Sequence, residues 1–113
     1  MEYAQKLYNL KKAEDQYRSD MRRITEKWDK EHKKIEAKYL KALDHLEKAE
    51  IREVKKDPKK KDTVSKKYDK KRAEIMSQWR KARKAINDRY TPLSESNRRK
   101  HELKLDKLRK ELY

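Results

Sequence analysis

Apolar side chains in the first half of the chain recur at alternating intervals of four and three residues. The series is interrupted once by a polar residue, Glu14, and consists of Tyr3, Leu7, Leu10, Tyr17, Met21, Ile24 and Trp28. Beyond Trp28, successive intervals of four convert this heptad into an 11-residue repeat, seen at Tyr17, Trp28 and Tyr39. These positions share one helical face, while the other faces are rich in charge. The pattern predicts one amphipathic helix over about residues 2–55.

The same sparse apolar pattern occurs twice. In residues 17–39 and again in residues 68–90, Tyr, Ile, Trp, Ile and Tyr stand at the same five offsets. A second amphipathic helix is therefore expected over about residues 64–90. An 11-residue period lets two such stripes face each other over a long distance, whether the halves arose by duplication or only share a helical period.

Two prolines mark the expected breaks in helical structure. Pro58 lies in a lysine-rich stretch, and proline disfavours helical geometry at the residue before it, so a loop is expected at about residues 57–63. Thr91 and Pro92 fit an N-cap followed by proline at the first helical position. A third, shorter helix is therefore expected over about residues 92–112. Its seam consists of Leu93, His101, Leu105, Leu108 and Leu112.

These elements predict an all-α fold. It is a long antiparallel helical hairpin, coiled-coil-like with an 11-residue apolar repeat, with the shorter third helix after Pro92. Residues 1–113 form a single helical domain. Folding the chain back at the loop places Tyr39 opposite Ala82 and Leu43 opposite Trp79. Because burial in two helices offsets little conformational entropy, we expect packing of the third helix, a homodimer or a bound polyanion to add stability.

Composition excludes several classes of protein. The chain has no Gly, so it lacks the phosphate-binding, dinucleotide-binding and nucleophile-elbow motifs that depend on glycine. It has no Cys, which excludes disulfides and thiol chemistry and fits a reducing compartment. The three histidines form no ligand set at helical spacing, and no nucleophile–base pair is evident. We therefore expect a non-enzymatic cytoplasmic protein that uses no cofactor and no metal.

Net charge is the strongest functional clue. The 36 Lys and Arg residues outnumber the 21 Asp and Glu residues and give a net charge of +15. A body of this charge attracts polyanions. The basic excess falls in clusters at the hairpin tip, along the second helix and near the start of the third. The predicted contact residues are Lys55, Lys56, Lys59, Lys60, Lys61, Lys66, Lys67, Lys70, Lys71, Arg80, Lys81, Arg83, Lys84, Arg98, Arg99 and Lys100.

Nucleic acid is the expected partner, bound through its backbone or shape with little reading of sequence. The alternative is an interaction module, such as an adaptor, assembly factor or inhibitor, that docks on an acidic protein or nucleoprotein surface. A membrane surface is disfavoured because the apolar stripes are needed for helix packing. Charge runs are also common on solvated helix faces, as in the interleaved charges of the first helix. Tyr8 and Tyr113 are the tyrosines that the stripes leave available to a partner.

Overall fold

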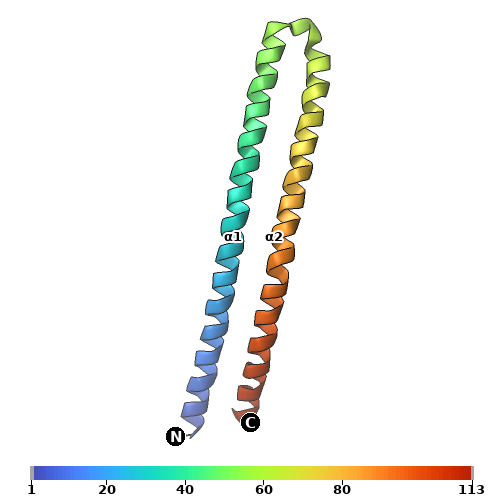
Figure 1. Ribbon diagram of the computed structural model, residues 1–113. Coiled ribbons are helices and arrows are strands. Elements are labelled where there is room, and N and C mark those ends of the chain that lie inside the picture. The colour runs from blue at the N-terminus through green and yellow to red at the C-terminus, as the bar shows by residue number, and fades with distance from the viewer. Residues whose placement is uncertain (1, 113) are drawn as a thin grey trace. The chain divides into compact units, whose positions relative to one another are not determined.

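The computed structural model describes residues 2–112, which form two helices joined by a short turn (Figure 1). Helix α1 spans Glu2–Lys56, the 3-10 turn η1 spans Pro58–Lys60, and α2 spans Lys61–Leu112. No strand occurs among the described residues. The predicted all-α helical hairpin is confirmed.

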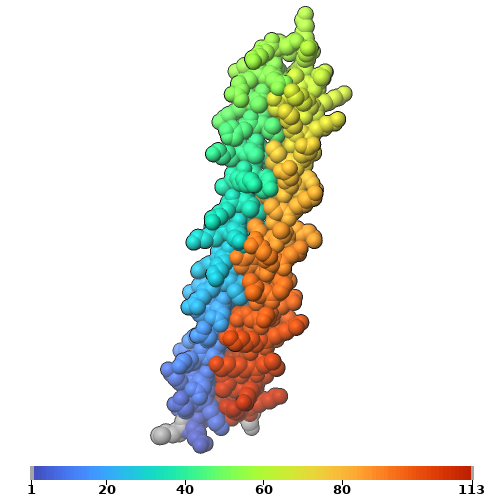
Figure 2. Space-filling view, in the orientation of Figure 1, coloured from blue at the N-terminus to red at the C-terminus, as the bar shows by residue number. Residues whose placement is uncertain are grey.

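The helices pair in two compact units. Unit 1 consists of Met1–Asp29 and Asn87–Tyr113, so it joins the first part of α1 to the last part of α2. Unit 2 is Lys30–Ile86, which contains the turn and the helix segments on either side of it. Within each unit the side chains of the two helices meet along the face seen in the space-filling view (Figure 2).

The seam of unit 2 is built from the aromatic and aliphatic positions that the repeat predicts. Val64, Tyr68 and Ile86 of α2 are buried. Trp79 is half-buried and stacks on Tyr39 of α1, with ring centroids 6.1 Å apart and planes inclined by 11°. The sequence placed Trp79 against Leu43, one helical turn further along α1. The Glu53–Tyr68 contact in the same unit fits the predicted register, so the large Trp79 ring reaches Tyr39 without a slip of one helix along the other.

Unit 1 has a smaller apolar core and a buried polar contact. Ala13, Leu105 and His101 are buried. His101 Nε2 lies 2.8 Å from an Asp20 carboxylate oxygen, and its ring meets Tyr17 edge-on at 5.1 Å. The hydrogen bond with His101 is the main cause that lowers the pKa of Asp20. The contact joins α1 to α2 and fixes their register in this unit.

The turn is shorter than the predicted loop at residues 57–63. Asp57 alone leaves helical geometry, with φ −145° and ψ 84°, because Pro58 follows it. The Lys60 amide then donates to the Asp57 carbonyl, and the Lys61 amide donates to the Pro58 carbonyl. Helix α2 therefore begins at Lys61, three residues before the predicted start.

The predicted break at Thr91 and Pro92 is wrong. Helix α2 continues through Pro92 to Leu112, so the structure has one helix where the sequence predicts two. Proline inside a helix cannot donate the hydrogen bond directed at the residue four positions earlier, at a cost of about 3 kcal/mol relative to alanine. Packing of α2 on α1 before and after Pro92 offsets this local preference.

Continuity of α2 also moves one predicted seam residue to the surface. Leu93 is 53% exposed, although it was expected to begin the seam of a third helix. In the continuous helix the seam steps from Tyr90 to Ser94 and Asn97, which are half-buried, and then to His101. Because Leu93 lies about 100° away from Ser94 around the helix, its side chain lies outside the seam.

Candidate functional site

Positive charge is unequally divided between the two units. Unit 2 has 21 Lys and Arg against 10 Asp and Glu, a net charge of +11. Unit 1 has 15 against 11, a net charge of +4. The units are of nearly equal length, so most of the attraction for a polyanion originates in unit 2.

Several acids of unit 2 are neutralised by neighbouring cations. Arg72 bridges the two helices by donating to Glu50 of α1 at 2.6 Å and to Asp69 of its own helix at 2.6 Å. These hydrogen bonds, led by the one to Glu50, raise the pKa of Arg72. Arg72 and Glu50 are half-buried, so this pair belongs to the packing between the helices. The charges of the two carboxylates are thereby neutralised by Arg72.

Glu53 is held near the turn by two donors from α2. The Tyr68 hydroxyl donates to a Glu53 oxygen at 2.7 Å, and Lys67 Nζ lies 3.2 Å from the same oxygen. The Tyr68 hydrogen bond, with Lys67 second, lowers the pKa of Glu53, and the same carboxylate raises the pKa of Tyr68. The contact joins α1 to α2 next to the tip lysines.

The face of α2 opposite the seam carries an exposed row of cations. Between Val64 and Ile86, α2 has nine Lys and Arg residues and only two acids, Asp69 and Glu74. Asp69 is bound by Arg72, as described above. The cations that lie about half a turn away from the seam, and are exposed, are Lys66, Lys70, Arg80, Lys81 and Lys84. We call this set the outer basic row.

The tip adds five exposed lysines around Pro58. Lys55 and Lys56 end α1, Lys59 and Lys60 lie in η1, and Lys61 begins α2. The structure therefore brings these five predicted contact residues together at one turn.

Three other predicted contact residues have structural contacts. Arg83 is half-buried and packs its guanidinium over Trp79, 4.1 Å from the ring centroid. Lys67 pairs with Glu53, and Lys71 Nζ lies 4.9 Å from the centroid of the Tyr68 ring. Cation–π contacts of this kind use the cation for packing. We therefore place Arg83, Lys67 and Lys71 outside the outer basic row.

The third predicted cluster belongs to unit 1. Arg98, Arg99 and Lys100 are exposed, and Arg98 lies 3.9 Å from Glu102 one turn later. Tyr8 is 60% exposed, as the helical pattern predicts, whereas Tyr113 lies outside the described residues.

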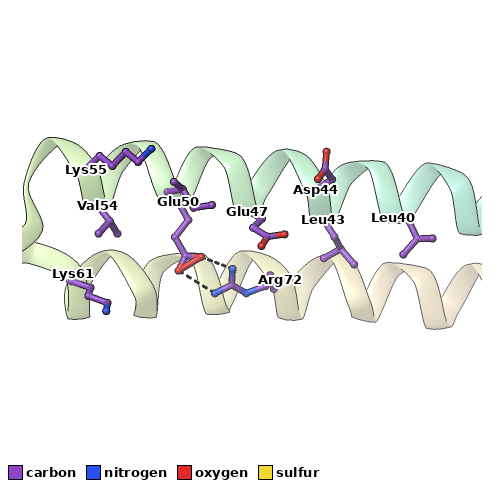
Figure 3. Close-up of a pocket in the computed structure, with 10 residues that line it drawn as sticks. Leu40, Leu43, Asp44, Glu47, Glu50, Val54, Lys55, Lys61 and Arg72 are labelled. Carbon is purple, nitrogen blue, oxygen red and sulfur yellow. Dashed lines mark hydrogen bonds and ion pairs between the residues drawn. The ribbon is translucent and has the colours of Figure 1, made fainter.

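A groove in unit 2 was missed by the sequence prediction. It has a volume of about 880 Å³ and is lined by apolar residues of α1, among them Leu40, Leu43, Ile51 and Val54 (Figure 3). Leu40 and Ile51 are 49% and 47% exposed. Leu40, Leu43, Ile51 and Val54 form a second apolar series, at intervals of three, eight and three residues. This series is the sequence signal from which the groove could have been predicted.

The described residues contain no group of three or more His or acidic side chains that could hold a metal ion. None of the helices in residues 2–112 is long and apolar enough to cross a membrane.

Comparison of the chain with protein-family models, with curated proteins and with solved structures finds no match.

Proposed function

We propose that unit 2 is a non-enzymatic module that binds the backbone of nucleic acid with little sequence specificity. The observation that carries this proposal is the outer basic row together with the five tip lysines, on a unit of net charge +11. Polyanion binding draws its free energy largely from the counterions that such cations release.

The form of the row favours backbone contact over base reading. Lysine is a flexible point charge and adapts to phosphates at varied distances, whereas base reading commonly uses the bidentate geometry of arginine. On the same face as the row, Ala73 and Ser77 are small and exposed. Their size leaves room for a sugar-phosphate strand to approach the helix between Lys70 and Arg80.

A docking site for an acidic protein surface is the competing function, because a carboxylate-rich partner would meet the same cations. Two features favour nucleic acid. Between its cations, the face that carries the row has the small residues Ala73 and Ser77 and no exposed large apolar residue of the kind that anchors protein interfaces. Its cations also recur along one helix face, which suits a uniformly charged strand.

The test is a salt titration of binding by fluorescence anisotropy, with labelled duplex DNA, duplex RNA and single strands of equal length. We expect the logarithm of the association constant to fall linearly with the logarithm of salt concentration. The slope should become less negative by about 0.9 for each duplex phosphate contact removed. The row variant changes four exposed lysines to Gln, namely Lys66, Lys70, Lys81 and Lys84.

A matched variant changes four exposed lysines of unit 1 to Gln, namely Lys11, Lys12, Lys104 and Lys107. Both variants lose the same net charge, so a general charge effect moves both equally. We expect the slope of the row variant to become less negative by up to about 3.6, and that of the unit 1 variant by less than about 1. Equal losses, or binding to polyglutamate as tight as to nucleic acid of equal charge, would contradict the proposal.

A further inference from the structure

The groove of unit 2 is an apolar surface next to the seam. Leu43 and Val54 point from α1 toward the space between the helices, at the edge of the groove (Figure 3). Leu40 and Ile51 line the groove while remaining about half exposed. These exposed apolar side chains, bordered by charged residues, form a small surface on which another molecule could pack.

The charge of the groove differs from that of the rest of unit 2. Its lining includes three acids and three bases, and Lys48 beside it pairs with Asp44 at 3.0 Å, so the groove carries little net charge on a unit of net charge +11. A polyanion gains no net attraction at a neutral surface. A second positively charged molecule, in contrast, meets less repulsion there than at the outer basic row.

The charges are also ordered along the groove. Asp44 and Glu47 lie toward its Leu40 end, whereas Lys55 and Lys61 lie at its tip end (Figure 3). A two-fold axis across the middle of the groove would lay two copies of α1 antiparallel. The acidic end of each copy then faces the basic end of the other, so the surface is self-complementary.

We infer that this groove is the interface of a symmetric dimer, in which a second copy of this chain packs the Leu40–Val54 face of α1 against the same face of the first. Two hairpins joined in this way place four helices side by side, an arrangement that buries more apolar surface than a single hairpin does. The row face of α2 lies opposite its own seam and is not among the groove-lining residues. The dimer therefore carries two outer basic rows, and its formation does not depend on the function proposed for them.

The first experiment measures the association state of the full chain, freed of nucleic acid by nuclease and high salt. Sedimentation velocity over about 1–200 µM protein should show a concentration-dependent dimer. Changing Leu40 and Ile51 together to Ser should weaken dimerisation at least tenfold. The control changes Leu93 and Leu103 of unit 1 to Ser, since these are 53% and 74% exposed and lie outside the groove.

The second experiment uses charge reversal and is independent of folding effects. One variant has bases at both ends of the groove, with Asp44→Lys and Glu47→Lys. The other has an acidic tip end, with Lys55→Glu and Lys61→Glu. Each alone should be monomeric, because like charges meet across the two-fold axis, and an equimolar mixture should form a heterodimer.

Three results would overturn the inference. They are a wild-type chain that is monomeric at the highest concentration, a dimer that only the unit 1 control weakens, and a charge-reversed mixture that stays monomeric. A monomeric wild type that binds a helix of another protein in this groove would reassign the surface to that partner. Circular dichroism of each variant separates loss of the interface from loss of helix.

Discussion

Replacement of Pro92 by Ala tests the continuity of α2 directly. Pro92 is exposed and lies inside the helix, so the substitution removes no buried contact. Alanine restores the amide hydrogen bond and removes the ring clash, which stabilises the folded state by about 3 kcal/mol. Alanine also gives the unfolded chain more conformational freedom, which destabilises the folded state by about 0.4–1 kcal/mol. We expect a net stabilisation of about 2 kcal/mol. Because unfolding entropy is about 2.1 cal/mol/K per residue, this raises the Tm of the 113-residue chain by about 8 °C.

The assay is thermal unfolding followed by circular dichroism at the helical band, together with urea unfolding. The matched control is Leu93→Ala, which alters the next exposed side chain and should change stability by less than about 0.5 kcal/mol. If Pro92 instead stood at the first position of a separate helix, it would be well tolerated there, and alanine would bring no gain. An unchanged or lowered Tm for Pro92→Ala would therefore refute the continuous helix.

Three further outcomes are expected from the seam contacts. Ile86→Ala should lower the free energy of unfolding by about 2–4 kcal/mol in urea titrations, because Ile86 is 3% exposed and its truncation leaves a cavity. The pKa of Asp20 is lower in the folded protein than its ordinary value of 3.8, so the bond to His101 stabilises the fold fully at pH values above 3.8. This stabilisation is lost as the pH falls through the pKa of Asp20 in the folded protein. The variant Asp20→Asn should therefore lose less stability than the wild type when the pH is lowered. The raised pKa of Tyr68 predicts that its phenol ionises later than other tyrosines in an alkaline absorbance titration, and Tyr68→Phe should remove that late component. A late component that persists in Tyr68→Phe would show that the bond to Glu53 is not its cause.

The architecture could be predicted from sequence because spacing alone determines which side chains share a helical face. The repeat placed Tyr68, Ile86 and Leu105 in the seam, and all three are buried. Continuity through Pro92 could not be predicted, because Thr-Pro is equally compatible with a helix start when only neighbours in sequence are considered. Packing of α2 on α1 on both sides of Pro92 favours the continuous helix over a new helix start.

The candidate site could be predicted only in part, for a similar reason. The lysines of the tip and of the outer basic row are exposed because their positions lie away from the seam, and the helical period predicts that. Glu53 is bound by a side chain of α2, and Arg83 folds over Trp79 of its own helix. Helical spacing predicts which face each residue lies on, but it does not predict these side-chain contacts. The groove requires knowledge of which face of α1 remains uncovered, and periodicity does not supply it.

The cross-helix ion pairs have a consequence for pairing specificity. In these contacts the carboxylates belong to α1, at Asp20, Glu50 and Glu53, and their partners belong to α2. Two α1 segments joined seam to seam would bring carboxylates together, and two α2 segments would bring Arg72 against other cations. At the seam, each helix is thus matched to the other and mismatched to itself, in the way that oppositely charged peptides select a heterotypic partner.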